Sequence, residues 1–240
     1  PPMPSVGCTQ IPMKKLCLSL TALTGLIAFQ PILLPAATGV GPSFKGPIGL
    51  QLYSLRAQFT KNVPETMAVV KRFGITEVEL AGTYNLSPEK FNELLKANGL
   101  KAVSGHFPFE RFRDEAEAVA KEAHALGLKY AGIAWIPHGT NFLEADLKSA
   151  IEVFNKAGET LAKHGIKFFY HCHGYEYAPF QGGTFLDALI AGTNPKTVSF
   201  EMAVFWVMPP GQDPAMWLAK YPRRWERLPV KSLKNGWPPS

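Results

Sequence analysis

Apolar runs of strand length alternate with helical segments along most of this chain, and this alternation constrains the fold more than any other feature. The predicted strands are Ile48–Ser54, Ile75–Ala81, Leu100–His106, Leu128–Ile136, Ile166–Tyr170, Thr197–Val204 and Arg227–Leu233. The predicted helices between them are Pro64–Phe73, Ser87–Gly99, Phe112–Leu126, Asn141–His164, Thr184–Ala191 and Asp213–Tyr221. Glycine closes several of these helices, as at Gly127 and Gly165, which is typical of helix C-termini. Repeated strand–helix units of this kind predict a parallel sheet covered by helices.

The pattern favours a barrel over a doubly wound open sheet. The strands are almost continuous apolar runs, as in parallel sheets that are buried on both faces. No Gly-x-Gly-x-x-Gly motif follows the first strand, which removes the main argument for a dinucleotide-binding fold. We therefore predict an α/β fold of the (β/α)8 TIM-barrel type that is incomplete, with about seven βα units. A chain of 240 residues with 46% hydrophobic residues can bury the core of one such domain, which we place at residues 46–240.

The stretch from Ile166 to Glu176 carries the residues best suited to a functional site. Its apolar run ends in His171, His173 and Glu176, and the C-terminal ends of strands are where α/β folds present reactive groups. His171 and His173 are two residues apart, so on an extended strand both imidazoles point the same way and can reach one metal ion. The alternative is structural, with one histidine donating a supporting hydrogen bond and the other capping the strand. Because several other strands also end in polar residues, we expect at least one of the two histidines to line a functional pocket.

Charge and cysteine content narrow the classes of function. The formal net charge is +6, but the basic residues are dispersed except around Arg223, Arg224 and Arg227, and there is no basic stripe interleaved with aromatic residues. We therefore expect no nucleic-acid partner, and a phosphorylated small substrate fits the charge equally well. Of the three cysteines, only Cys172 lies in the region predicted to fold, which excludes a disulfide framework there.

Residues 1–45 are predicted to lie outside the folded domain. Met13 and two lysines begin a short basic region, Leu16 to Phe29 is apolar and uncharged, and prolines and small residues follow as far as Gly39. This is the pattern of a secretory signal peptide that starts at Met13, so we expect an exported protein, periplasmic or extracellular, without stable membrane insertion after cleavage. An uncleaved membrane anchor is the alternative, because the apolar run up to Leu34 approaches spanning length.

Seven motifs of this chain resemble those of one protein family. They are Gly49-Leu-Gln-Leu-Tyr-Ser-Leu-Arg56, Ile75-Thr-Glu-Val-Glu-Leu-Ala81, Ser104-Gly-His106, Tyr170-His-Cys-His-Gly-Tyr-Glu-Tyr177, Phe200-Glu-Met-Ala-Val-Phe-Trp206, Gly211-Gln-Asp-Pro214 and Tyr221-Pro-Arg-Arg224. By these motifs, the chain from Gly46 to Gly236 resembles the sugar phosphate isomerase/epimerase family, the xylose-isomerase-like TIM barrels. The resemblance implies a small carbohydrate substrate and proton transfer beside a sugar carbonyl. It also implies one divalent metal ion (Mn, Mg, Co or Zn) at the barrel mouth.

Chemistry of this kind needs groups that polarise a carbonyl oxygen and groups that take and return a proton. The candidates for catalysis are Glu176, His171 and Glu79, and the candidates for binding the metal are His173 and Glu201. The candidates for substrate binding are Gln51, Tyr53, His106, Trp135 and Trp206, of which the two tryptophans offer apolar walls for a sugar ring. Each has an ordinary structural alternative, such as an ion pair for Glu79. Their convergence on one end of the barrel favours the functional interpretation.

Departures from the family pattern put the metal site in question. Relatives have an aspartate ligand where this chain has Ala203 and a histidine ligand where it has Pro229, and a last carboxylate ligand would lie beyond Ser240. Alanine and proline cannot bind an ion, so we expect weak metal binding and weak or absent activity. Two classes of function stay open. The first is an enzyme, either an isomerase or epimerase or a 3-keto-glycoside lyase, and the second is a non-catalytic or vestigial sugar-binding barrel.

Overall fold

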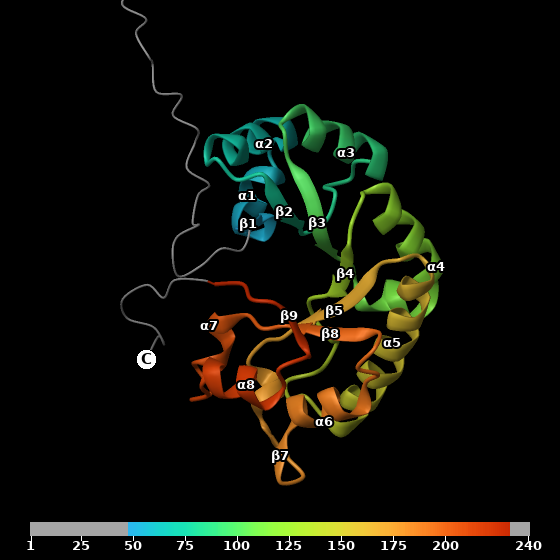
Figure 1. Cartoon of the computed structure of the whole chain (residues 1–240), viewed down its shortest axis with the longest axis vertical. Helices are drawn as coiled ribbons and strands as arrows, with labels where there is room; N and C mark the ends of the chain where they lie inside the picture. The colour runs from blue at the N-terminus through green and yellow to red at the C-terminus, as the bar shows by residue number, and fades with distance from the viewer. Residues whose placement is uncertain (1–47, 231–240) are drawn as a thin grey trace, which may run out of the picture. The chain divides into compact units, whose positions relative to one another are not determined.

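The computed structural model describes residues 48–230, and these residues form a sheet of seven parallel strands with helices around it (Figure 1). The strands, in the order in which they pair, are β1 (Gly49–Gln51), β2 (Glu77–Leu80), β3 (Lys101–His106), β4 (Tyr130–Ile133), β5 (Lys167–His171), β8 (Val198–Glu201) and β9 (Trp225–Arg227). A short antiparallel hairpin, β6 (Pro179–Phe180) with β7 (Gly183–Thr184), projects from the loop after β5. The curled half-barrel confirms the prediction of an incomplete (β/α)8 fold.

Helices follow the strands and cover the outer side of the curled sheet (Figure 1). They are α1 (Arg56–Phe59), α2 (Val63–Arg72), α3 (Pro88–Ala97), α4 (Phe109–Ala125), α5 (Glu144–Lys163), α6 (Phe185–Gly192), α7 (Val204–Val207) and α8 (Pro214–Lys220). The start of α3 has the cap that its sequence indicates, because Ser87 Oγ accepts a hydrogen bond from the Lys90 amide at 3.3 Å and Pro88 follows.

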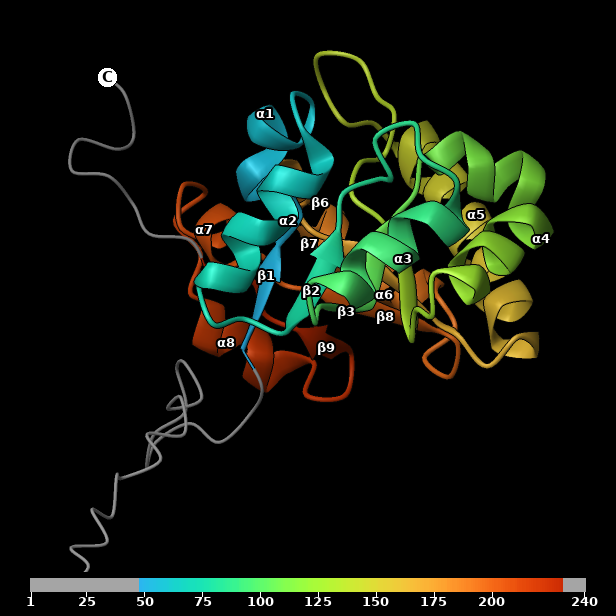
Figure 2. The same cartoon turned by 90° about the horizontal axis from the view of Figure 1, so that it is seen from above.

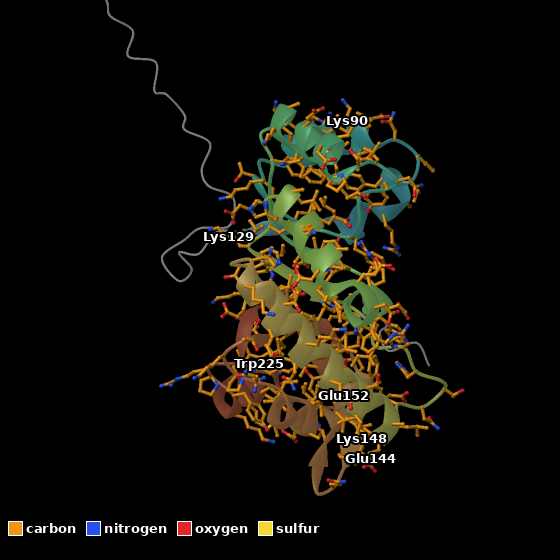
Figure 3. The ribbon with its side chains drawn as sticks, turned by 90° about the vertical axis from the view of Figure 1, so that its right-hand side faces the viewer. Lys90, Lys129, Glu144, Lys148, Glu152 and Trp225 are labelled. Carbon is orange, nitrogen blue, oxygen red and sulfur yellow. The ribbon has the colours of Figure 1, made fainter. Side chains whose placement is uncertain are left out.

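Helices α4 and α5 lie side by side (Figure 2). The outer face of α5 carries charged side chains, among them the ion pair of Glu144 and Lys148 at 2.8 Å (Figure 3). Its inner face presents Phe154 to the sheet. The apolar stripe of α5 thus packs inward while its charged side meets solvent.

Several predicted strands are shorter in the structure, and the bounds of the first and the last strand bear on the site. The first ends at Gln51 instead of Ser54, because Leu52–Leu55 forms a 3-10 helix that buries Leu52. The last was predicted to begin at Arg227, but β9 ends there. Pro229 has no backbone N–H to donate to a strand pair, so the ladder stops before it. Arg227 therefore lies at the end of a strand, where functional side chains of this fold are found.

Side chains of β5 alternate between the two faces of the sheet. Phe168 points to the helices, where it contacts Phe112 and Phe154 at ring-centroid distances of 5.4 and 5.2 Å. Phe169 points to the inner side, where its ring lies 5.2 Å from that of His106. By the same two-residue period, His171 follows Phe169 on the inner side. The outer layer is thus an aromatic core, and the inner layer carries the polar site.

Gly132 allows β4 and β5 to approach each other closely. A Cβ atom at this position would lie 2.2 Å from the carbonyl oxygen of Phe169 and 2.7 Å from its ring. No side chain larger than hydrogen fits there without moving the backbone. The close approach places the Phe169 ring beside His106.

One ion pair shows how strongly the sheet curls. Neighbouring strands lie about 4.8 Å apart, so the five steps from β2 to β9 would separate them by roughly 24 Å in a flat sheet. Yet Nε of Arg227 on β9 lies 3.0 Å from Oε2 of Glu79 on β2. The curl therefore brings strand ends from opposite sides of the sheet to one place.

The predicted signal peptide, and the rest of residues 1–45, lie outside the described residues. Among the helices that are described, none combines the length and the apolar character needed to cross a membrane.

Candidate functional site

Glu79 is fixed at the inner end of β2 by donors from three other strands. Its Oε1 accepts a hydrogen bond from Gln51 Nε2 at 2.6 Å, and its Oε2 accepts one from Ser104 Oγ at 2.7 Å. Gln51 and Ser104 are the register partners of Glu79 on β1 and β3, so pairing along the sheet sets both contacts. Arg227 from β9 adds an ion pair at 3.0 Å. Glu79 is thus a buried carboxylate whose surroundings fix its position.

His106, His171 and Glu201 form a second group, called here the His–His–Glu cluster. His171 and Glu201 are register partners on β5 and β8, and Nδ1 of His171 lies 2.8 Å from Oε2 of Glu201. His106 comes from β3, three strands away from β8 along the sheet, and its Nε2 still lies 3.4 Å from the same oxygen. In a flat sheet these two strands would be roughly 14 Å apart. The curl of the sheet therefore assembles the cluster.

Electrostatic interactions bind this cluster together. Burial alone would raise the pKa of Glu201, but the hydrogen bond with His171 and the nearby imidazole of His106 outweigh it and hold the pKa well below its usual range. Burial would lower the pKa of His106, but the nearby carboxylates of Glu79 and Glu201 outweigh it and raise that pKa. The carboxylate of Glu201 is therefore ionised at neutral pH.

The His–His–Glu cluster fits a divalent metal ion. One ligand atom from each of the three residues lies within 4.8 Å of the others, and it is the single such group of His, Cys, Asp and Glu side chains found within residues 48–230. His106 Nε2 is buried and has no hydrogen-bond partner, although the carboxylates of Glu201 and Glu79 lie 3.4 and 3.7 Å away. Zinc sites combine imidazole nitrogens and carboxylate oxygens in this way at about 2.0–2.2 Å. The donor set and the unsatisfied imidazole nitrogen both suit a cation.

Aromatic rings border the cluster. The His173 ring lies 5.0 Å from that of His171, and Trp135 and Trp206 contact His173 at centroid distances of 5.4 and 5.6 Å. Trp135 stacks on His138 at 4.6 Å while half of its surface stays exposed. The two tryptophans thus both flank His173, beside the inner site.

Glu176 belongs to a separate network in the loop after β5. Its carboxylate is fully buried and accepts hydrogen bonds from the Tyr170 hydroxyl and, at 3.0 Å, from the His173 amide. The Tyr170 and Tyr175 hydroxyls lie 2.6 Å apart, and Tyr175 accepts a hydrogen bond from the Ile136 amide at 3.2 Å. Burial raises the pKa of Glu176 to about 7, against partial compensation by these hydrogen bonds. The network ties the loop after β5 to the loop after β4.

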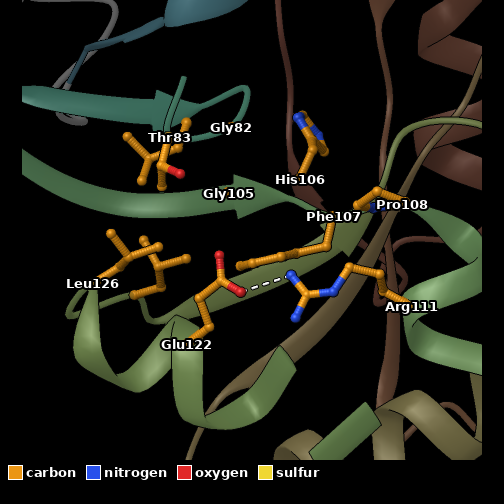
Figure 4. Close-up of a pocket in the computed structure, with 11 residues that line it drawn as sticks. Gly82, Thr83, Gly105, His106, Phe107, Pro108, Arg111, Glu122 and Leu126 are labelled. Atoms are coloured by element: carbon orange, nitrogen blue, oxygen red, sulfur yellow. Dashed lines mark hydrogen bonds and ion pairs between the residues drawn. The ribbon is translucent and has the colours of Figure 1, made fainter. Parts of the chain in front are cut away.

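A small pocket of about 200 Å³ lies between the β2 end of the sheet and α4 (Figure 4). Its walls include Phe107 and Leu126, and its polar groups include the ion pair of Arg111 and Glu122, whose Nη1 and Oε2 atoms are 2.6 Å apart. The His106 ring points away from this ion pair in Figure 4. Pockets for small-molecule ligands usually measure about 300–1,000 Å³, so this one is smaller than expected for a sugar.

Comparison with solved structures finds proteins that share this architecture. A sugar phosphate isomerase/epimerase from Parabacteroides distasonis matches with a TM-score of 0.67 and 25% identity over 79% of this chain and 79% of that one. A second from the same organism matches with a TM-score of 0.67 and 27% identity over 75% of this chain and 77% of that one. The chain is thus similar in fold and, at about a quarter of its positions, in sequence to two sugar phosphate isomerase/epimerase structures. The motifs in the sequence had indicated this resemblance, although no protein-family model and no curated protein matches the sequence.

More distant proteins share the fold as well. The IOLI protein, whose crystal structure contains a bound zinc atom, matches with a TM-score of 0.58 over 79% of this chain and 75% of that one. At 11% identity the match shows the shared fold alone.

The structure brings some of the predicted site residues together and leaves others apart. Glu79, Gln51, His106, His171 and Glu201 meet on the inner side of the sheet. Trp135, Trp206 and His173 lie together at its border. Glu176 contacts Tyr170 and loop backbone, and Tyr53 is exposed with the Arg56 guanidinium over its ring. The metal role predicted for His173 and the catalytic role predicted for Glu176 stay predictions.

Sequence reasoning missed two residues of the inner site, Arg227 and Ser104. Arg227 was placed at the start of a strand, where its side chain would lie far from the barrel mouth. Ser104 lies two residues before His106 on β3, so it shares the inner face with that histidine. The two-residue period along β3 was a signal that could have found it.

Ala203 and Pro229 lie next to each other beyond the ends of β8 and β9. The Val204 amide donates a hydrogen bond to the Pro229 carbonyl at 3.1 Å, and Ala203 is buried. Neither side chain offers a ligand atom. These two positions therefore add no ligand to those of His106, His171 and Glu201.

Proposed function

We propose that this protein binds a small carbohydrate and transfers a proton beside its carbonyl group, as a sugar isomerase or epimerase. The observation that carries the proposal is the convergence of Glu79, His106, His171 and Glu201 at the ends of β2, β3, β5 and β8. Active sites of barrel enzymes gather their side chains from the same ends of several strands. The relationship to sugar phosphate isomerase/epimerase proteins supports this class of reaction.

Each group of the site has a role in this proposal. His106, His171 and Glu201 hold the divalent ion, which supplies Lewis-acid polarisation of a carbonyl when it is bound. Glu79 takes the proton from the neighbouring carbon and returns it, while Gln51 and Ser104 fix the carboxylate.

The border of the site offers surfaces for a sugar ring. Trp135 and Trp206, which both contact His173, supply apolar faces of the kind that pack against sugars. The half-exposed ring of Trp135 is the more accessible of the two aromatic faces.

Exchange of substrate hydrogen with solvent tests the proposal directly. The protein, supplied with Mn²⁺ or Zn²⁺, is incubated in D₂O with a panel of aldoses, ketoses and their phosphates, and proton NMR follows loss of signal at the carbon beside the carbonyl. We expect exchange with at least one sugar, and its loss in Glu79→Gln. The control Glu152→Gln changes an exposed residue of α5 and should keep full exchange. Absence of exchange with every sugar tested would refute an isomerase or epimerase.

A non-catalytic sugar-binding barrel is the second candidate. Ala203 and Pro229 favour it, because they stand where the family resemblance predicts two metal ligands. Under this alternative, sugars quench the fluorescence of Trp135 and Trp206 or shift the melting temperature, but they exchange no hydrogen with solvent.

A further inference from the structure

Arg227 lies between the two carboxylates of the inner site. Its Nε is 3.0 Å from Oε2 of Glu79 and 3.4 Å from Oε1 of Glu201. The guanidinium also lies over the rings of Tyr130 and Phe169, at 5.5 and 5.8 Å from their centroids. Its side chain is 22% exposed, so it is largely enclosed by the inner side of the sheet. A permanent positive charge is thus built into the site.

Glu201 divides its two oxygens between this charge and the histidines. Oε2 faces His171 and His106 at 2.8 and 3.4 Å, while Oε1 faces Arg227. A metal ion in the His–His–Glu cluster would therefore bind the same carboxylate that Arg227 already contacts. Two positive charges would then share one carboxylate at close range.

The contacts of Arg227 indicate that its positive charge affects metal binding more than its hydrogen bonding holds Glu79 and Glu201 in place. Its contact with Glu201 is long at 3.4 Å, and Glu201 has a shorter bond to His171 that does not involve Arg227. Glu79 likewise has bonds from Gln51 and Ser104 at 2.6 and 2.7 Å. We therefore expect both carboxylates to stay in place in a variant without the arginine.

The effect of the Arg227 charge on metal affinity can be compared with the effect of losing its contact to the ligand Glu201. A unit charge roughly 6 Å from a divalent ion, at an effective dielectric constant of about 20, changes its affinity by several powers of ten before the site relaxes. Loss of a supporting contact to a ligand costs only about 10–100-fold. Repulsion is the larger of the two effects.

We propose that Arg227 is the resident cation of this site, and that it offsets part of the negative charge of Glu79 and Glu201 and holds the affinity of the His–His–Glu cluster for divalent metal ions low. The inference rests on the metal cluster of the proposed function and adds the residue that controls it. Ala203 and Pro229 leave the cluster with three ligands, and Arg227 supplies the charge that a tightly bound ion would otherwise bring. Arg227 acts through Glu201 and Glu79 and is a positioning residue in this sense.

Metal titration of matched variants of the full chain tests this inference. After dialysis against a chelator, Zn²⁺ and Mn²⁺ are titrated separately into the wild type, Arg227→Gln, Arg227→Met and Arg227→Lys by calorimetry. We expect both neutral variants to bind at least about tenfold more tightly than the wild type, and Arg227→Lys, which keeps the charge, to stay within about threefold. The control Arg223→Gln removes one exposed charge outside the site and should leave the affinity unchanged.

The outcomes distinguish a failure of this inference alone from a failure of the metal site in the proposed function. If the wild type binds metal and the neutral variants bind equally or more weakly, Arg227 is a support and the inference is wrong, while the metal site stands. If neither the wild type nor the variants bind Zn²⁺ or Mn²⁺, the metal site and the inference fail together. Should Arg227→Gln not fold, Arg227→Met, which keeps the packing on Tyr130 and Phe169, gives the decisive affinity. A purely structural arginine predicts lower stability with no gain in metal affinity.

Discussion

The buried carboxylate of Glu176 should make the stability of this protein fall as the pH rises towards neutrality. Burial raises its pKa from 4.5 to about 7 in the folded protein. Below pH 4.5 the group is protonated in both the folded and the unfolded chain, so its contribution to stability is then complete. Between the two pKa values the unfolded chain ionises and the folded one does not, so this contribution declines until the pH passes about 7. At 1.36 kcal/mol per pKa unit, the loss amounts to about 3 kcal/mol.

Glu176→Gln isolates this contribution. The amide oxygen of glutamine can accept from the Tyr170 hydroxyl and the His173 amide as Oε1 does, and glutamine carries no charge at any pH. The free energy of unfolding of the variant minus that of the wild type should therefore rise by about 3 kcal/mol between pH 4.5 and 8. Urea denaturation followed by circular dichroism at closely spaced pH values gives this difference.

Taking the difference between two proteins removes the titration of all other groups, including His106. Glu152→Gln, which changes an exposed residue of α5, serves as the control for the loss of one carboxylate. A flat difference for Glu176→Gln would mean that the Glu176 carboxylate ionises in the folded protein as easily as in the unfolded one. The desolvation argument for this residue would then be wrong.

Three further predictions concern other parts of the chain. Gly132→Ala should destabilise the fold by about 3 kcal/mol or more in denaturant unfolding, because its Cβ would lie 2.2 Å from the Phe169 carbonyl oxygen; a loss below 1 kcal/mol would contradict this close approach. Ala203→Asp combined with Pro229→His should tighten Mn²⁺ binding about tenfold or more in calorimetry, since it adds two ligand side chains; unchanged affinity would show that these positions do not reach the ion. Mass spectrometry of the exported protein should find no peptide from before about Gly39, and an intact N-terminus would refute cleavage.

Much of the fold followed from local patterns in the sequence. The apolar runs predicted seven strands in one parallel sheet, and all seven are present, because buried strands are read from short-range hydrophobicity. Gly165 and the Ser87 cap marked helix ends, because such signals depend on the local backbone alone. The bounds of β9 were predicted wrongly. The sequence is apolar beyond Arg227, and the prediction did not take into account that Pro229 cannot continue the strand pairing.

Some features of the site could likewise be predicted from local sequence, and others could not. His171 and Glu201 could be predicted because each ends an apolar strand, and register then placed them side by side. The partners that meet across the half-barrel could not be predicted. His106 reaches Glu201 from three strands away, and Arg227 reaches Glu79 from five strands away. These contacts depend on the curl of the whole sheet. The curl accumulates over every strand pair, so no single segment of the sequence predicts it. The sequence determined which side chains stand at the strand ends, and the tertiary structure decided that an arginine, two histidines and two carboxylates share one place.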